Sequence, residues 1–310
     1  SDAVSRTSSL HPAEARAMPH WGGLGLVYAL LLWTAAPVSV RQSPPPLEQR
    51  EAGLGVIHVA YAADVGAFTG LLSALLSLSR SLERPRDCRV HLLVAGEDAA
   101  RARGLGACLL RELGPGAAAP AVEVHALRAE AVRFNSSKIA GLPDSKAKFF
   151  KFYLADLLPG VDRVLYLDTD TIVRTDLGPL YRMPMDHALA CVRERATMGL
   201  FLHALGTDAS RLRPHMPDEA LPQLQAGVLL LDLRRWRSEA IAQALEEWPA
   251  KLGTYGDQLL LSLEFNYRRG HDALDQAWNV YGAGLQHRFE RLITRTPDWA
   301  PEHLAVSRTL

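Results

Sequence analysis

The sequence predicts an α/β fold built on a mostly parallel central sheet. Apolar, strand-like runs alternate with helical patterns, and this order is typical of doubly wound sheets. One run, RVLYL at Arg163–Leu167, is followed at once by the carboxylates of Asp168 and Asp170. Polar residues directly after a buried strand indicate the carboxyl edge of the sheet, where open α/β folds bind their ligands.

In the first half of the chain, each element follows from a local pattern. The run VIHVAYA at 56–62 predicts the first strand, and 70–82 predicts a helix. The run CRVHLLVA at 88–95 predicts the second strand, and a helix follows it to about Leu113. After a loop rich in Gly, Ala and Pro, 122–127 predicts the third strand.

The second half begins with aromatic and leucine residues at helical spacing in 145–158, and Pro159 and Gly160 end that helix. The strand that precedes Asp168 comes next. Further strands are predicted at 188–192 and 227–233, and an amphipathic helix at 234–252. The polar segment 197–222 contains three prolines, and we expect it to cover a substrate.

Composition restricts the class of protein. The 310 residues, 48% of them hydrophobic, can bury one large core or two modest ones. Lys plus Arg equals Asp plus Glu at 34 each, which argues against nucleic acid as a partner. Three cysteines lie far apart without a C-x-x-C pair, so we expect buried thiols rather than a zinc site or a disulfide framework.

The N-terminal region divides into three parts: a segment at 1–20, a charge-free apolar stretch at 21–40 and a proline-containing linker at 41–54. Twenty apolar residues are just enough for a helix to cross a bilayer, so we expect a signal anchor or a cleavable signal peptide at 21–40. A loose apolar tail is the alternative. Asn135-Ser136-Ser137 is an N-glycosylation sequon, which fits secretory passage. The folded part is expected from 55 to 310.

The Asp168-x-Asp170 pair predicts a metal site. Two converging carboxylates repel each other unless a cation lies between them, and oxygen ligands favour Mg²⁺ or Mn²⁺. Such an ion in turn favours a diphosphate. The alternative is that the two acids merely cap a turn or the next helix.

Four stretches occur in one order, and together they resemble family 8 of the retaining glycosyltransferases. They are Ala62-Ala63-Asp64, KFYLADLLPGVDRVLYLDTD at 151–170, QAGVLLLDLRRWR at 225–237 and YGDQLLLSL at 255–263. The resemblance runs from about Val56 to about Gly284. It implies a single catalytic domain of the nucleotide-sugar transferase type A fold, with a Rossmann-like sheet. It also implies transfer of a hexose or pentose from a UDP-sugar to a glycan or glycoprotein, with retention of configuration.

The resemblance assigns donor-binding roles to several residues. Asp170 would ligate Mn²⁺ or Mg²⁺ directly, and Asp168 would bridge the metal and the donor ribose. Ala62 and Asp64 correspond to the strand end that reads the nucleobase, and Lys151 to a cation that contacts the donor. The alternative for Lys151 is that it is a solvated helix residue, and the alternative for Asp64 is that it caps the next helix.

The resemblance also assigns residues near the sugar. Gln225, Ala226 and Gly227 stand where the family has Asn-Ala-Gly or Asn-Ser-Gly, and Asp257 and Gln258 match its Asp-Gln pair. Gln225, Asp257 and Gln258 are the catalytic candidates. The alternatives are a turn residue for Gln225 and a helix N-cap for Asp257.

One departure from the family is plain. The late H-x-G-x-x-K-P-W motif, which supplies a third metal ligand and a lysine for the diphosphate, is absent. We expect either an incomplete C-terminus or a different way of holding metal and phosphate. Two other functions stay open: a catalytically impaired sugar-nucleotide or glycan-binding relative, and a haloacid-dehalogenase-type phosphatase with Asp168 as nucleophile. Together with segment 21–40, the family resemblance implies the secretory pathway, as a single-pass type II Golgi membrane protein or in the lumen.

Overall fold

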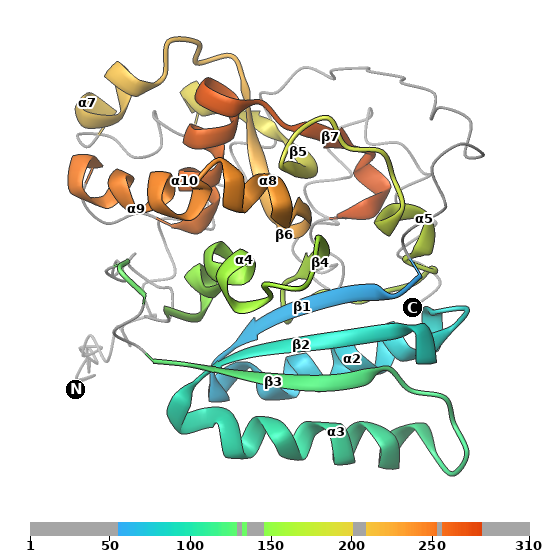
Figure 1. Ribbon diagram of the computed structural model, residues 1–310. Coiled ribbons are helices and arrows are strands. Elements are labelled where there is room, and N and C mark those ends of the chain that lie inside the picture. Colours follow the sequence, from blue (N-terminus) through green and yellow to red (C-terminus); the bar gives the residue numbers. More distant parts are fainter. Residues whose placement is uncertain (1–54, 129–131, 135–145, 201–208, 253–255, 281–310) are drawn as a thin grey trace, which may run out of the picture.

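A seven-stranded sheet forms the centre of the protein, with the strand order β3-β2-β1-β4-β6-β5-β7 (Figure 1). The computed structural model describes residues 55–128, 132–134, 146–200, 209–252 and 256–280. The strands are β1 Ile57–Ala63, β2 Cys88–Ala95, β3 Ala121–Leu127, β4 Arg163–Leu167, β5 Leu189–Thr197, β6 Pro222–Asp232 and β7 Asp272–Leu274.

Most neighbouring strands are parallel, as the sequence predicts. β1 pairs in parallel with both β2 and β4, β2 with β3, and β5 with β7. β6 is the exception, because it runs antiparallel to both β4 and β5. The beginning of β6 therefore lies beside the end of β4, and both reach the same edge of the sheet.

Helices cover both faces of the sheet. α2 (Phe68–Ser81) and α3 (Ala99–Leu113) pack together against the β1-β2-β3 half (Figure 1). The other side carries a 3₁₀ segment at Lys146–Tyr153, α4 (Leu154–Leu157), α8 (Leu233–Ser238), α9 (Ile241–Leu252) and α10 (Asp257–Glu264). Two further short helices are α5 (Gly178–Tyr181) and α7 (Ala209–Leu212).

Four predicted elements differ from the structure. The strand expected at 188–192 is β5, which continues to Thr197. The helix expected at 145–158 is mostly a 3₁₀ segment with one turn of α-helix at its end. The helix expected at 234–252 is two helices, because Ala240 adopts a left-handed conformation with φ of 49° between α8 and α9. β6 begins at Pro222 rather than 227, so Gln225 lies inside a strand and not in a turn before it.

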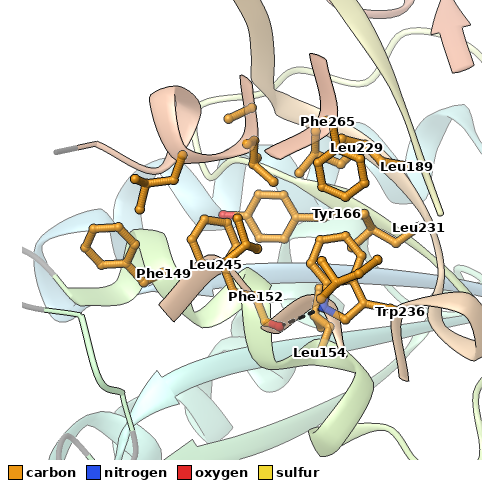
Figure 2. Close-up of a cluster of buried hydrophobic side chains, with 14 of the residues drawn as sticks. Phe149, Phe152, Leu154, Tyr166, Leu189, Leu229, Leu231, Trp236, Leu245 and Phe265 are labelled. Carbon is orange, nitrogen blue, oxygen red and sulfur yellow. Dashed lines mark hydrogen bonds between the residues drawn. The ribbon is translucent and has the colours of Figure 1, made fainter. Parts of the chain in front are cut away.

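The larger hydrophobic core lies between the sheet and the layer formed by segment 146–157, α8, α9 and α10 (Figure 2). Phe149 and Phe152 are buried there against Phe134, with ring centroids 4.7 and 5.2 Å from it. The indole Nε1 of Trp236 donates a 3.0 Å hydrogen bond to the carbonyl of Phe152. This packing fixes the 3₁₀ segment, and with it Lys151, against the sheet.

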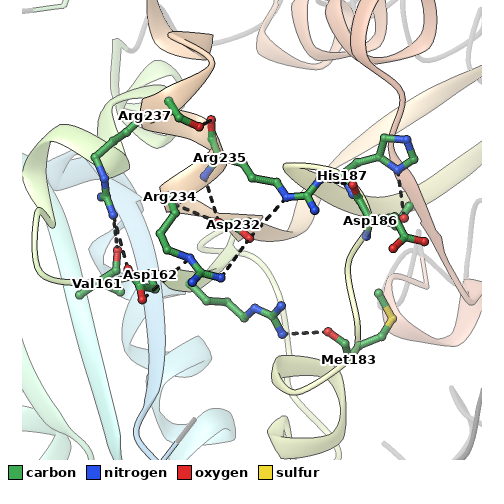
Figure 3. A network of polar contacts seen from close by, with 12 residues as sticks. Val161, Asp162, Met183, Asp186, His187, Asp232, Arg234, Arg235 and Arg237 are labelled. Carbon is green, nitrogen blue, oxygen red and sulfur yellow. Dashed lines mark hydrogen bonds and ion pairs between the residues drawn. The ribbon is translucent and has the colours of Figure 1, made fainter. Parts of the chain in front are cut away.

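An arginine-rich network lies where β4 begins and β6 ends, at the edge of the sheet opposite the carboxyl end of β4 (Figure 3). Asp232 caps α8 by accepting hydrogen bonds from the backbone N–H groups of Arg234 and Arg235. Arg237 donates to the carbonyls of Ala155, Leu158 and Val161, at the end of α4 and in the turn that follows it. These contacts hold α4 against α8, and both helices contribute side chains to the larger core.

Several predictions concern residues outside the described ranges. The apolar stretch at 21–40 and the sequon at 135–137 are among them. Among the described helices, none combines the length and the apolar character that crossing a membrane requires. Cys88 and Cys191 are buried free thiols, as expected, whereas Cys108 is half-buried.

Candidate active site

The carboxylate of Asp168 stands directly after β4, at the carboxyl edge of the sheet. Its backbone N–H donates to the carbonyl of Gly227 at 2.8 Å, which ties it to β6. The hydroxyl of Tyr166, two residues back on the same strand, donates to Asp168 Oδ1 at 2.8 Å. Asp170 is exposed just beyond it. The sequence prediction of a strand that delivers acids to this edge is confirmed.

Lys151 is the buried cation of the site. Only 1% of its surface is exposed, so the alternative of a solvated helix residue is wrong. Its Nζ lies 2.7 Å from Asp257 Oδ2, 3.1 Å from the carbonyl oxygen of Ala226 and 3.3 Å from Asp168 Oδ1. All three ammonium protons therefore have protein partners. Lys151 also lies 4.3 Å from the centroid of the Tyr166 ring.

The pKa shifts follow from this arrangement. Burial by itself lowers the pKa of Lys151, but Asp168 and Asp257 outweigh burial, and the pKa is raised. The pKa of Asp168 is also raised, first by desolvation and then by Asp257 and Asp170, while Lys151 and Tyr166 oppose the shift. Since 39% of the Asp168 side chain is still accessible, its second oxygen can receive a cation from the open edge.

A bulge in β6 shapes the other wall of the site. Between the pairs Cys191–Leu229 and Arg193–Leu224 the register of β5 and β6 shifts, so Gln225, Ala226 and Gly227 fall in the irregular part of the strand. The carbonyl of Ala226 turns to Lys151. A Cβ on Gly227 would lie 3.4 Å from both Asp168 Oδ2 and the Asn279 amide, so glycine leaves room here. Bulges of this kind often adjoin active sites.

Gln225 is 6% exposed, and its amide oxygen has no hydrogen-bond partner in the part of the chain that is described. Its side chain is hydrogen-bonded to the carboxyl of Glu194 on β5, and since a carboxylate accepts, the Gln225 amide N–H donates. Burial raises the pKa of Glu194, and this hydrogen bond opposes the shift. Gln258 on α10 is half-buried, and its Nε2 is a buried atom without a partner among the described residues. Buried polar atoms without partners are rare and mark candidate ligand contacts.

Ala62 and Asp64 lie at the end of β1, the strand adjacent to β4. Asp64 Oδ1 accepts a hydrogen bond from the backbone N–H of Ala67 at 3.2 Å, so the expected alternative of a helix cap is observed. A nucleobase contact through the other carboxylate oxygen remains compatible with that cap. For Asp257 the capping alternative is wrong, because Gly256 is the N-cap residue of α10.

The structure therefore brings Lys151, Asp168, Ala226, Gly227 and Asp257 into one contact group. Ala62, Asp64 and Asp170 lie at the neighbouring strand ends, Gln225 in the β6 bulge and Gln258 on α10. Sequence reasoning missed Tyr166 and Glu194. Tyr166 could have been found from its position two residues before Asp168, because residues two apart on a strand share a face. Nothing local in the sequence pairs Glu194 with Gln225.

Comparisons with known proteins agree with this geometry. The model of the family "Glycosyl transferase family 8" matches residues 124–298. The chain is 28% identical over 243 residues to "Probable galacturonosyltransferase-like 9" of Arabidopsis thaliana, covering 74% of this chain and 60% of that protein. It is 26% identical to "Probable galacturonosyltransferase-like 8" of the same plant, again over 74% of this chain. The chain thus spans about 60% of the length of these relatives.

Solved structures share the fold. A galactosyltransferase, LgtC, crystallised with donor and acceptor sugar analogues, superposes with a TM-score of 0.56 at 23% identity, over 71% of this chain and 74% of LgtC. Mouse xyloside xylosyltransferase 1 superposes with a TM-score of 0.52 at 18% identity, over 77% of this chain and 92% of that enzyme. Both bear out the predicted nucleotide-sugar transferase type A fold.

Proposed function

The chain belongs to glycosyl transferase family 8 and is a glycosyltransferase; from that premise we propose that it moves a hexose or pentose from a UDP-sugar to a glycan or glycoprotein acceptor. Configuration at the anomeric carbon is retained in this proposal, as the family resemblance implies. The observation that carries the proposal is the contact group at the carboxyl edge, in which Lys151 holds Asp168 and Asp257 together.

The acidic edge fits a hard divalent cation such as Mn²⁺ or Mg²⁺. Asp168 Oδ1 is occupied by Tyr166 and Lys151, which leaves Oδ2 for a metal beside the exposed carboxylate of Asp170. Carboxylate oxygens are the ligands that such ions prefer. When bound, the cation stabilises the charge that develops on a leaving UDP without a proton transfer.

The chain's own groups then have distinct tasks. Lys151 has all its protons engaged, so we assign it the positioning of Asp168 and Asp257; direct contact with the donor stays a prediction. We assign Ala62 and Asp64 to contact with the nucleobase, and Ala226 and Gly227 to a close approach of the donor. The buried amide oxygen of Gln225, oriented by Glu194, faces no protein donor among the described residues. We assign it, with Asp257 and Gln258, to stabilisation of an oxocarbenium-like state.

Glycan acceptors and secretory localisation belong to the same proposal. The segment 197–222 is our candidate for the acceptor contact. Localisation in the Golgi membrane or lumen rests on the apolar stretch 21–40 and on the sequon at 135–137. A fluorescent fusion of the full chain that stays cytosolic, with no glycosidase-sensitive mass shift, would contradict it.

The enzymatic test is a panel of UDP-sugars (glucose, galactose, xylose and galacturonate), scored for UDP release with and without Mn²⁺. The relatives named galacturonosyltransferase-like make UDP-galacturonate a natural member of it. Asp170→Asn keeps the side-chain shape but removes the charge, so it should abolish the Mn²⁺-dependent release. Asp156→Asn, at an exposed position on α4, is the matched control and should behave like the wild type.

Either of two results overturns the proposal. Unchanged, metal-dependent release by Asp170→Asn would remove the metal assignment. Release from no donor by the folded wild-type chain would favour the sugar-nucleotide or glycan-binding alternative. The phosphatase alternative has no support, because the family match covers the Asp168-x-Asp170 stretch itself.

A further inference from the structure

Three histidines form a ladder across β1, β2 and β3, on a different part of the sheet from the acidic edge. Nδ1 of His58 lies 2.9 Å from Nε2 of His91, and Nδ1 of His91 lies 3.0 Å from Nε2 of His125. The sheet register explains the ladder: Ala60 pairs with His91, and Leu93 with His125. Each histidine is thus the diagonal neighbour of the next on the same face.

A carboxylate completes the group. Glu123 pairs directly with His91 across the strands, and its Oε2 lies 3.6 Å from His91 Nδ1. In the part of the chain that the structure describes, His91, Glu123 and His125 are the one group of three whose ligand atoms all lie within 4.8 Å of one another. Glu123 also faces Arg89, whose Nη1 is 3.5 Å from Oε1.

We propose that His91 Nδ1, His125 Nε2 and Glu123 Oε2 form a second metal site, selective for Zn²⁺ or a similar borderline cation rather than for Mn²⁺. Zinc binds imidazole nitrogen at about 2.0–2.1 Å, which puts two ligand atoms of a tetrahedral site about 3.3 Å apart. His91 Nδ1 lies 3.0 Å from His125 Nε2 and 3.6 Å from Glu123 Oε2, and these distances lie on either side of that value. Two imidazoles and one carboxylate are a ligand set typical of zinc with an open fourth position.

His58 supplies the outer support that such a site needs. A ligating histidine usually donates its other ring N–H to a fixed partner, which sets the tautomer. Nε2 of His91 can donate to Nδ1 of His58, and this leaves the lone pair of His91 Nδ1 for the metal. The planes of the two rings are nearly parallel, with an interplanar angle of 4°. His91 is almost fully buried, so its orientation is fixed by packing.

The protonation state agrees with this geometry. Burial, and then the neighbouring histidines, lower the pKa of His91 to about 3. The pKa values of His58 and His125 are lowered as well, mainly by burial. All three rings are therefore neutral at neutral pH and keep their lone pairs. Without metal, His91 Nδ1 accepts a hydrogen bond from His125 Nε2–H. A zinc ion bound to His125 Nε2 requires the proton of that ring to be on Nδ1 instead, so the tautomer changes while the ring stays neutral.

The test uses the full chain carrying Asp170→Asn, so that metal binding at the acidic edge contributes little to the signal. Bound metal is first removed with a chelator. Co²⁺ is titrated by its visible absorption, which is intense only in tetrahedral sites, and Zn²⁺ is then added to displace it. We expect one Co²⁺ per chain, displaced by Zn²⁺ but not by Mn²⁺. His125→Gln and Glu123→Gln should each abolish the absorption, and His58→Gln should weaken Zn²⁺ binding by about 10–100-fold.

His215→Gln is the matched control, because His215 is half-buried on the 3₁₀ turn at Arg213–His215 and lies outside the ladder. It should bind Co²⁺ like the parent chain. Glu123 is 45% exposed, so its replacement is safe for the fold even if a histidine variant unfolds. No tetrahedral Co²⁺ spectrum in the parent chain, or the same spectrum in Glu123→Gln and His125→Gln, would reduce the ladder to a hydrogen-bonded network.

Discussion

The ammonium of Lys151 lies 2.7 Å from a carboxylate oxygen of Asp257, a residue 106 positions further along the chain. The same ammonium contacts Asp168, so one buried cation serves two acids from different elements. Two carboxylates this close would repel each other without it. Lys151 is therefore the centre on which the arrangement of the site depends.

Replacement of Lys151 by Met should destabilise the protein and reduce UDP release. Loss of one partner from a buried ion pair costs about 3–5 kcal/mol. We expect about 3 kcal/mol, the low end, because Asp168 is 39% exposed and water screens it in part. Urea denaturation measures the change. Lys148→Met on the same 3₁₀ segment, whose contact is with the Phe149 ring, is the control and should cost far less. Equal stability of both variants would refute the role.

Gln225→Ala should lower kcat by about 10²-fold, the order typical of removing one electrostatic contact to a transition state. Mn²⁺-dependent UDP binding, measured by calorimetry, should change little, because the proposed function assigns the donor's diphosphate to Asp168 and Asp170 rather than to Gln225. Gln223→Ala is a matched control: the residue is buried on the same strand, and its amide oxygen also has no partner among the described residues. A loss of kcat equal in both variants would point to strand damage instead.

Glu264→Gln should loosen α10, the helix that carries Asp257. Glu264 is 1% exposed; it accepts from Trp248 Nε1 at 2.9 Å and pairs with Arg269 at 2.7 Å and Arg268 at 3.3 Å. Hydrogen bonds to charged groups contribute about 1.5–3 kcal/mol each, and both arginines can rehydrate. We expect a loss of about that size in the free energy of unfolding. Glu247→Gln, an exposed change on α9, should leave the thermal midpoint where it is.

His271 should make stability depend on pH between about 4 and 6.5. Burial, then Arg193, lowers its pKa to about 4; the Phe265 backbone and Asp272 oppose the shift, and His187 adds to it. Arg193 Nε donates to His271 Nε2 at 3.0 Å, which requires a neutral ring. Below pH 6.5 the unfolded chain binds a proton that the folded chain refuses, so stability falls as pH falls towards 4.

That dependence is measured as the free energy of unfolding at a series of pH values in wild type and His271→Gln. The variant should show a shallower slope within the window and no difference in slope above pH 7. His215→Gln serves again as the control. Parallel curves for wild type and His271→Gln over the whole range would contradict the assignment.

Local patterns were enough to predict most of the fold. β2 has the predicted bounds, and β1 and β3 differ from the predictions by one residue, because apolar runs between turn signals define buried strands. The acids after β4 were predicted for the same reason. The prediction of a single helix at 234–252 was wrong because the amphipathic pattern continues across Ala240. No local signal in the sequence indicates the left-handed backbone of that residue.

The site could be predicted only in part. Asp168, Lys151 and Asp257 stand in recognisable motifs, but their shared contact depends on how distant segments meet. The Glu194–Gln225 contact and the bulge in β6 depend on strand register, which periodicity does not specify when both faces of a strand are buried. The histidine ladder was missed for the same reason: its members lie more than thirty positions apart and meet only through pairing.

The insertion of β6 between β4 and β5 has a consequence for the order of folding. β2 and β3 each pair with the strand that precedes them in the chain. The centre of the sheet is assembled from distant segments instead: Val59 of β1 pairs with Leu165 of β4, and Leu165 pairs with Leu230 of β6, which fills the gap between β4 and β5. Such long-range pairing carries a large loop-closure cost and is slow. The backbone bond from Asp168 to Gly227 and the lysine contact to Ala226 can form only after that step. During refolding, recovery of donor binding should therefore lag behind the recovery of secondary structure.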